Sequence, residues 1–372
     1  MSRAGFDVAV VGAGVIGSAI AYECARRGAR VVLLDRDQPG QHASGAAAGM
    51  LAPCSEAHEA GPFLDMARES LRIWPEFAAA VQEAAGEDPE LHLDGLLRVA
   101  LDSADAETIH ARLRWQHDQG IDDGQWVDAP TAHDIEPALH ADVAGAAWYP
   151  GEGHVHSRHA VHAMAAAATA RGAELRTHAQ VAAPTATGLE LNDGTRIDAD
   201  RIILAAGAWL GAIAAHFGAA LPVRPVHGQL LALTGLPRTP RRVLYAGPKG
   251  YVVARQDGTV LAGATEEDRG FDATPSPQVA QSLRQTADRL LDGAAQAAAE
   301  TQSWAGLRPA APDRLPLLGA LPGDPTGRVI VAGAHYRNGV LLAPATARGI
   351  ADLALDGRTP NGWQAFDPRR FG

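Results

Sequence analysis

A strand, glycine loop, helix and second strand at residues 6–35 constrain the fold more than any other feature of this chain. The apolar run Phe6–Val11 leads into Gly12-Ala-Gly-Val-Ile-Gly17. A helical pattern covers about residues 15–27, and a second apolar run, Arg30–Leu34, ends at Asp35. This order within about 30 residues predicts the β–α–β unit that binds a dinucleotide. The alternative is an ordinary glycine turn in a chain rich in glycine and alanine.

Each glycine of this loop has a separate physical purpose in such a unit. Gly12 permits a tight turn, Gly14 lets the backbone approach a pyrophosphate, and Gly17 lets the helix pack closely on the strand. The N-terminus of the helix then faces the phosphate charge. Asp35, 18 residues after Gly17, is placed to bind the hydroxyl pair of a ribose.

The composition predicts a globular protein with room for two domains. The chain has 372 residues, of which 47% are hydrophobic and 20% are charged, a balance that argues against long disorder. Its net charge of −11 argues against nucleic acid or an anionic membrane as a partner. The sequence has no apolar run of about 18 residues and no signal-peptide pattern at its start. We therefore expect a cytoplasmic protein with no membrane partner.

Two kinds of strand follow along the chain. Buried strands at Arg201–Ala205 and Arg328–Gly333 are typical of the same parallel sheet, and a helix over Pro344–Leu355 follows the second. Strands with hairpin-like turns, such as Gln256-Asp-Gly258, predict an antiparallel sheet. These strands are expected at residues 95–101, 145–149, 224–234, 242–255 and 259–265. Further helices are expected at residues 63–85 (broken at Pro75), 104–119, 164–170 and 277–299.

We therefore expect an α/β fold in which a second, α+β domain is inserted twice into a Rossmann-like domain. The dinucleotide-binding domain is expected to be discontinuous and to comprise residues 1–85, 150–222 and 304–372. The second domain, built on the antiparallel sheet, is expected at residues 86–149 and 223–303.

Several longer motifs occur together with the glycine loop. They are Ser44-Gly-Ala-Ala-Ala-Gly-Met50-Leu-Ala-Pro, Ile203-Leu-Ala-Ala-Gly207-Ala-Trp209, Gly228-Gln229, Gly263-Ala-Thr265, Trp304-Ala-Gly-Leu-Arg308-Pro and His335-Tyr-Arg-Asn-Gly339-Val-Leu-Leu-Ala-Pro344-Ala-Thr. In this combination the chain resembles, from end to end, the FAD-dependent enzymes of the D-amino-acid oxidase superfamily, and most of all the glycine oxidases of the ThiO type. The resemblance implies FAD as the cofactor and a fold of the glutathione-reductase type.

The segment His335–Thr346 supports a flavin independently, because the N1/O2 edge of a flavin becomes anionic on reduction. Backbone amides of residues 338–342, at a helix start, are placed to stabilise that charge. An ordinary strand–helix crossover is the alternative. The resemblance adds a lining for the pyrophosphate and flavin and a backbone contact from Val181 to adenine, although Val181 could equally be a core residue of a strand. The expected cofactor-binding residues are Gly12, Gly14, Val15, Ile16, Gly17, Asp35, Arg36, Ala43, Ser44, Ala48, Gly49, Met50, Val181, Gly207, Trp209, His335, Tyr336, Arg337, Asn338, Gly339, Val340 and Leu341.

The resemblance also implies an anchor for the carboxylate of an amino-acid substrate. Arg308 would hold that carboxylate bidentately, Tyr251 would offer its hydroxyl, and Arg337 would be a second arginine of the pocket. Surface roles for the arginines and strand packing for the tyrosine are the alternatives. Met50 and Glu266 complete the expected substrate-binding residues.

The implied reaction is oxidative deamination of glycine or a similar small amine. A hydride passes from Cα to flavin N5, the imine hydrolyses, and O2 reoxidises the flavin to give H2O2. Hydride transfer from a neutral amine requires no side-chain base, so we expect no acid or base catalyst. His335 and His227 are expected to act as local hydrogen-bonding residues. A place in thiamine (thiazole) biosynthesis and a homotetramer rest on the resemblance alone.

Two positions depart from the family pattern. Glu266 stands where glycine oxidases often have an apolar pocket residue, and Lys249, the only lysine, stands where a family member can have histidine. A carboxylate pointing into the pocket would favour a cationic or amine-bearing substrate, whereas a solvated loop is the alternative. Glycine, sarcosine, small D-amino acids and aminophosphonate-type amines therefore stay open as substrates.

The cysteines and histidines bear on how the cofactor is attached and on whether a metal ion binds. Some members of the family that the chain resembles bind FAD covalently through a cysteine in the C-terminal half. Cys24 and Cys54 are the only cysteines here, so the resemblance implies non-covalent FAD, and a link to Cys54, near the expected flavin lining, is the alternative. Four histidines lie between His154 and His162, and we expect solvated or core-edge side chains there and no metal site. A quinone-linked dehydrogenase, a protein with a structural flavin and an NAD-dependent enzyme are the alternative functions.

Overall fold

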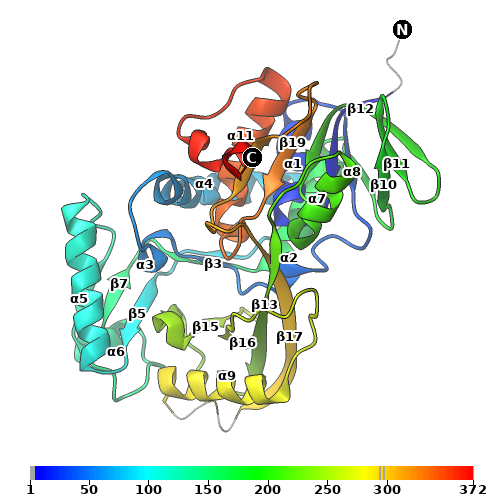
Figure 1. The fold of residues 1–372 in the computed structure, drawn as a ribbon. Coiled ribbons are helices and arrows are strands. Elements are labelled where there is room, and N and C mark those ends of the chain that lie inside the picture. Colours follow the sequence, from blue (N-terminus) through cyan, green and yellow to red (C-terminus); the bar gives the residue numbers. More distant parts are fainter. Residues whose placement is uncertain (1–4, 293–294, 296–297, 372) are drawn as a thin grey trace.

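The structure is a computed structural model that describes residues 5–371 except 293–294 and 296–297. The described strands form two eight-stranded sheets and one three-stranded sheet. Figure 1 shows one large sheet with its helices in the upper part of the molecule and the other in the lower part.

The first sheet contains the glycine-loop unit. Its strands are β1 (Phe6–Val11), β2 (Val31–Leu34), β9 (Glu174–Arg176), β10 (Val181–Pro184), β11 (Gly188–Leu191), β12 (Arg196–Leu204), β18 (Leu317–Ala320) and β19 (Val329–Gly333). β1 pairs in parallel with β2 and β12, β2 pairs with β9, and β12 pairs with β19. This confirms that two strands distant in sequence join the parallel sheet. β18 and the hairpin β10–β11 add antiparallel pairs.

Helices cover the first sheet. They are α1 (Val15–Arg26), α4 (Pro62–Ala85), α7 (Ser157–Ala170), α8 (Leu210–His216) and α11 (Gly339–Asp356). Apolar residues of α1, α4, α7 and α11 form one core with the inner side of β1 and β2, and α8 packs on the opposite side. The continuous apolar runs of β1 and β2 follow from this burial on both faces.

The second sheet has the order β17-β13-β16-β15-β14-β5-β7-β6. Its strands are β5 (Leu96–Ala100), β6 (Gln125–Val127), β7 (Gly145–Tyr149), β13 (Arg224–Thr234), β14 (Val243–Tyr245), β15 (Tyr251–Ala254), β16 (Val260–Gly263) and β17 (Ala299–Ala310). The expected antiparallel pairing holds except between β14 and β5, which run parallel. The sheet is therefore mixed, because β5 joins it from a distant part of the chain and no hairpin fixes its direction.

Three helices accompany the second sheet, and short elements join the two layers. α5 (Ser103–Asp118), α6 (Ala129–Ile135) and α9 (Pro277–Leu290) are the helices, and α6 and α9 share a core with one face of the sheet. The connecting elements are α2 (Ala43–Ala46), α3 (Pro53–Glu56), the strands β3 (Met50–Leu51), β4 (Leu91–His92) and β8 (Gly153–Val155), and the 3-10 turns η1 (Gly207–Trp209), η2 (Gly247–Lys249), η3 (Trp363–Phe366) and η4 (Pro368–Phe371).

Helix α4 runs through Pro75, so the expected break at this residue is wrong. A proline inside a helix costs about 3 kcal/mol. Trp74 is completely buried on α4, and Ile73 and Phe77 are almost completely buried. The burial of these side chains, at about 1.5–3 kcal/mol each, outweighs the cost of the proline.

Two other helix boundaries differ from expectation. The helix from Pro277 ends at Leu290, and Ala299 already belongs to β17; part of the expected helix lies outside the described residues. The last long helix begins at Gly339 and includes Pro344. Alanine favours a helix by propensity, but pairing with β13 places Ala299 in a strand.

Helix α4 compensates for the proline inside α11. Ser70 Oγ donates to the carbonyl of Leu341 at 2.7 Å and accepts from the N–H of Ala345 at 3.2 Å. In a regular helix this N–H and this carbonyl would bond to each other. Trp74 Nε1 donates to the same carbonyl at 3.1 Å. α4 therefore fixes the first turn of α11, which faces the cavity described next.

Candidate active site

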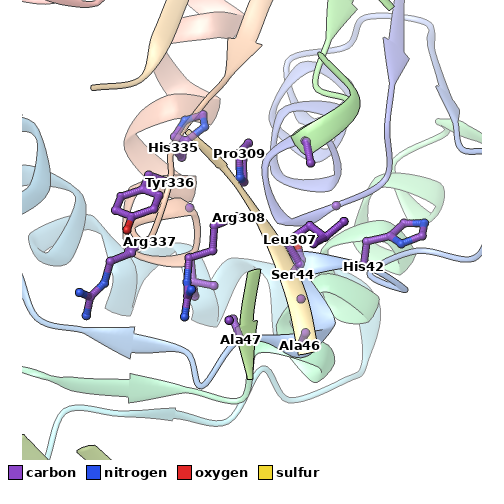
Figure 2. Close-up of a pocket in the computed structure, with 18 of the residues that line it drawn as sticks. His42, Ser44, Ala46, Ala47, Leu307, Arg308, Pro309, His335, Tyr336 and Arg337 are labelled. Carbon is purple, nitrogen blue, oxygen red and sulfur yellow. The ribbon is translucent and has the colours of Figure 1, made fainter. Parts of the chain in front are cut away.

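A cavity of about 940 Å³ has walls from both large sheets. Every expected substrate residue lines it, as do all expected cofactor residues except Gly17 and Leu341. Figure 2 shows the Ser44 segment on one side, Leu307–Pro309 on β17 in the middle, and residues His335–Arg337 on the other side. Gly17 and Leu341 instead lie in the core around α1 and α11.

The glycine loop has the geometry that its spacing predicts. Gly12 has φ +108°, and a Cβ there would lie 2.5 Å from the carbonyl oxygen of Ala205. A Cβ on Gly17 would lie 1.7 Å from the carbonyl oxygen of Gly12, so only glycine lets α1 pack this closely. The first amide of α1, Val15 N–H, reaches the cavity wall and donates to Ser44 Oγ at 3.0 Å.

Asp35 lies at the end of β2 on the cavity wall. Its Oδ2 accepts from the N–H of Ala13 at 2.6 Å, and its Oδ1 accepts from the N–H of Asp37 at 2.8 Å. A carboxylate has about four acceptor positions, so two backbone bonds leave capacity for ligand hydroxyls. The two bonds hold the side chain in place beside the glycine loop.

Aromatic and cationic side chains gather around Trp209, which lines the cavity as Asp35 does. The guanidinium of Arg36 lies 3.9 Å from the centre of the Trp209 ring. The rings of His42 and Phe271 lie 4.7 and 5.6 Å from Trp209. Phe271 comes from the loop after β16 and belongs to the other layer, so the stack connects the two layers at this end.

Arg308 extends from β17 into the other end of the cavity (Figure 2). Its Nη1 donates to the carbonyl of Thr265 at 2.9 Å and to that of His227 at 3.4 Å. A Cβ on Gly228 would lie 2.0 Å from this Nη1, which explains the glycine of the Gly228-Gln229 motif. No carboxylate of the described residues lies within 4 Å of the guanidinium. Burial lowers the pKa of Arg308 from its ordinary value.

Arg337 lies beside Arg308 and points in the same direction in Figure 2. Its Nη2 donates to Glu56 Oε1 at 2.9 Å, and the Glu56 carboxylate raises the pKa of Arg337. Tyr251 is buried, and burial raises the pKa of its hydroxyl, so Tyr251 stays a neutral donor. The two arginines thus differ: Arg337 has a carboxylate partner and Arg308 has only carbonyl partners.

Glu266 and Lys249, the two residues that depart from the family pattern, line the cavity, and each forms an ion pair with a neighbouring side chain. Glu266 pairs with Arg314 at 2.9 Å; burial would raise its pKa, but the Tyr336 hydroxyl and Arg314 together lower it. Lys249 Nζ lies 2.6 Å from Asp105 and 3.3 Å from Asp102. Neither charge is left without a counter-ion.

The two histidines near the site differ from each other. His335 Nε2 hydrogen-bonds to Thr346 Oγ1 at 3.0 Å, and burial lowers its pKa to about 3, so the ring is uncharged. His227 is completely buried, and neither ring nitrogen has a hydrogen-bond partner among the described residues. Its Nδ1 nevertheless lies 3.5 Å from Glu267 Oε1, and the backbones of His227 and Glu267 are hydrogen-bonded to each other.

Several residues of the cavity wall had no predicted role. Glu56, His58, Arg98 and Tyr245 lie near the Arg337 end. Arg98 is 6% exposed, donates to the carbonyl of Ser55 at 2.5 Å and lies over the Tyr245 ring. Pairing between distant elements brings these side chains together, and no spacing in the sequence indicates it.

The histidine-rich segment and the two cysteines have ordinary environments. His154 packs against His92, His156 stacks on His159, and His162 bonds to the carbonyl of Pro39. Among the residues described, no group of three or more histidine, cysteine or acidic side chains is arranged to hold a metal ion. Cys24 and Cys54 are buried and unpaired, and burial raises the pKa of Cys24 to about 12.

The geometry fits a long cofactor with a pyrophosphate. Glycines allow close approach to the wall: a Cβ on Gly14 would lie 3.0 Å from Ser44 Oγ, and Gly49 has φ +81°. The Asp35 carboxylate lies beyond this loop, and the first turn of α11 lies on the wall nearer to Arg308. The fold and the cavity thus define a dinucleotide-dependent enzyme with a second, basic binding end.

Within the described ranges no helix is long and apolar enough to cross a membrane.

Comparison with known proteins gives the family. Residues 7–353 match the family of FAD dependent oxidoreductases (DAO), and the chain belongs to this family. It is therefore an FAD-dependent oxidoreductase, as the resemblance implied.

Several similar proteins match nearly the whole chain. The chain is 35% identical to the glycine oxidase of Pseudomonas aeruginosa, over 95% of both chains. It is 35% identical to the bifunctional protein ThiO/ThiG of Synechocystis over 98% of its own length, but it spans only 54% of that relative. The crystal structure of glycine oxidase from Geobacillus kaustophilus superimposes with a TM-score of 0.91 at 33% identity, covering 97% of this chain and 98% of that one.

Proposed function

We propose that this enzyme oxidises glycine or a similar small primary or secondary amine that carries a carboxylate. The observation that carries the proposal is Arg308, a cavity-lining cation that has carbonyl partners and no carboxylate partner among the described residues. A guanidinium in this state is suited to a bidentate bond with a carboxylate. The family and the glycine oxidases similar to this chain support the same substrate class.

In the proposed complex, Arg308 and the Tyr251 hydroxyl bind the substrate carboxylate. Arg337, held by Glu56, completes a basic wall without offering a second free charge. Met50 limits the space on the side of the β3 strand. Fixing the carboxylate orients Cα, and this positioning, without an acid or base side chain, is the protein's part in the reaction.

FAD, when bound, supplies the two-electron acceptor for hydride from Cα and transfers the electrons to O2, which gives H2O2. We propose that it is held non-covalently by the predicted cofactor residues, because no cysteine follows Cys54 and neither Cys24 nor Cys54 lines the cavity. We propose the domain boundaries given above, with FAD on the first-sheet side and substrate on the second-sheet side. A cytoplasmic location, a homotetramer and a role in thiazole synthesis belong to the same proposal, on the likeness to ThiO proteins.

The substrate is left open between glycine, sarcosine, small D-amino acids and aminophosphonate-type amines. Glu266 lines the cavity, but its pairing with Arg314 reduces its attraction for a cationic substrate end. Lys249 is neutralised by two aspartates in the same way. These pairings favour the small substrates over those with a further charged group.

The test is anaerobic mixing of the FAD-loaded enzyme with glycine, sarcosine and D-alanine. Loss of the flavin absorbance near ~450 nm, and its return with H2O2 on admission of air, supports the oxidase. Reduction without reoxidation by air, but with a quinone, would replace the oxidase by a dehydrogenase. Arg308→Met should raise KM for the substrate about 10- to 100-fold. Arg358→Met, at an exposed arginine, is the matched control.

A further inference from the structure

Four successive carbonyl groups of the cavity wall are held from the side away from the cavity. Trp304 Nε1 donates to the carbonyl of Ala46 at 3.1 Å, and Ser157 Oγ donates to that of Ala47 at 2.6 Å. The N–H of Val155 donates to the carbonyl of Gly49 at 2.9 Å. The carbonyl of Ala48 is bound by a charged donor, Arg255.

Arg255 is a buried cation behind this segment. It is 8% exposed and follows strand β15. Its Nη2 donates to the carbonyl of Ala48 at 2.8 Å, and its Nη1 donates to that of Val155 at 3.1 Å and lies 3.5 Å from His154 Nδ1. No described carboxylate lies within 4 Å of the guanidinium; Glu90 and Asp257 are the nearby acids. Burial lowers the pKa of Arg255 to about 10, so it keeps its charge at neutral pH.

The N–H of Ala48 shares a peptide with the carbonyl of Ala47, and the N–H of Gly49 shares a peptide with the carbonyl of Ala48. In a trans peptide the N–H points opposite to the C=O, so carbonyls bound from behind turn these N–H groups toward the cavity. Both residues are buried and line the cavity, and neither N–H has an acceptor among the described residues. Buried N–H groups are rarely left without a partner, so we infer that these two donate hydrogen bonds to a ligand.

The charge of Arg255 acts on one of these donors directly. The carbonyl of Ala48 and the N–H of Gly49 share one peptide, and hydrogen bonds in such a chain polarise one another. A guanidinium on the carbonyl therefore strengthens the N–H as a donor. Gly49 has φ +81°, and a Cβ there would lie 2.0 Å from the carbonyl oxygen of Val155, so the strained turn depends on glycine.

We propose that Arg255 is a positioning residue for the FAD ring, acting through the peptide between Ala48 and Gly49. The peptide presents a polarised N–H to an electron-rich, hydrogen-bond-accepting edge of the ring, and the buried positive charge favours the ring's uptake of electrons. Ser157 supports the neighbouring N–H of Ala48 in the same way without adding charge. The inference rests on FAD as the cofactor.

The experiment measures FAD affinity of the apoprotein and the midpoint potential of the bound flavin, for the whole chain. Arg255→Met should bind FAD about 10-fold more weakly, because a charge-assisted bond is lost, and its flavin should have a more negative potential. Ser157→Ala should weaken FAD binding with little change in potential. The matched control is Arg284→Met, at an arginine that also holds two carbonyls, those of Ala295 and Ala298, but lies outside the cavity lining.

Arg255→Gln, which keeps a donor but no charge, is measured in parallel and serves if the methionine variant does not fold. A folded Arg255 variant with the wild-type potential would overturn the inference, even if its melting temperature is lower, because a purely structural role predicts that result. A wild-type chain that binds no FAD would instead overturn the proposed function, so the two failures are distinguishable.

Discussion

The carboxylate of Glu152 accepts a hydrogen bond from the backbone N–H of Ser55 at 3.0 Å, and a second from Cys54 N–H at 2.6 Å. These are first-turn amides of α3, the short helix that ends at Glu56. Glu152 is 2% exposed, and burial raises its pKa to about 7. A buried titratable group thus holds the helix that pairs with Arg337.

This pKa shift predicts a pH dependence of stability with a defined sign. The folded state keeps the Glu152 proton up to about pH 7, whereas the unfolded state keeps it only to its ordinary value of 4.5. The stabilisation is complete below pH 4.5 and is lost as the pH rises through 7, by up to about 3 kcal/mol. Urea unfolding of Glu152→Gln at pH 5 and pH 8 should therefore show a smaller difference than wild type. Equal differences in both proteins contradict the prediction, and Glu59→Gln controls for loss of an exposed charge.

Gly228 leaves the space that the Arg308 guanidinium occupies. In Gly228→Ala the new Cβ would lie 2.0 Å from Nη1, so the guanidinium must move. We expect KM for the amine substrate to rise about 10- to 100-fold while FAD affinity stays unchanged. Steady-state kinetics and FAD titration check this. Gly151→Ala, at a glycine with open space around it, is the control; an unchanged KM in Gly228→Ala would mean that Arg308 does not bind the substrate.

Ser70 replaces one backbone hydrogen bond of α11. Ser70→Ala leaves the carbonyl of Leu341 with the Trp74 donor and the N–H of Ala345 without a protein acceptor. We expect the free energy of unfolding to fall by about 1–3 kcal/mol. Thermal or urea unfolding measures the loss. Thr108→Ala on the exposed α5 removes a hydroxyl bonded to its own helix and should change stability much less.

Glu56 neutralises Arg337 at the basic end of the cavity. Glu56→Gln removes this counter-ion, so Arg337 becomes available to a carboxylate ligand. We expect acetate to bind the FAD-loaded enzyme severalfold more tightly, measured by the perturbation of the flavin spectrum. Glu76→Gln, which removes the exposed partner of Arg348, is the control. Unchanged acetate binding would place the ligand carboxylate away from Arg337.

The features that the sequence predicts best are those set by local geometry. Gly17 must be glycine because of its contact with Gly12 within one β–α–β unit, and Gly12 has a positive φ in the turn of that unit, so their spacing alone indicates the fold. The last helix and the helix at Pro75 were harder to predict, because partners distant in sequence, such as Ser70 beside α11, overcome the cost of a proline.

The residues of the site also fall into those that the sequence predicts and those that only the fold brings together. Arg308 was predicted from a motif and Tyr251 from the resemblance, and the structure brings both to the cavity. Glu56, Arg98 and Arg255 have no motif, since their positions depend on pairing between α3, β5 and β15 and the rest of the fold. The ring of His227 is not part of the cavity lining, which Gly228 and Leu230 of the same strand reach, because successive side chains of a strand point to opposite faces.

Strand β17 carries Trp304, which holds the carbonyl of Ala46, and, four residues later, Arg308. At about 3.4 Å per residue, the two positions lie about 14 Å apart along one strand, and β13 pairs with it over that length. The strand therefore fixes the distance between the part of the wall expected to contact the cofactor and the residue expected to bind the substrate. A different substrate length would therefore require changes elsewhere in the cavity wall, such as α3 or the loop after β16, and not along β17.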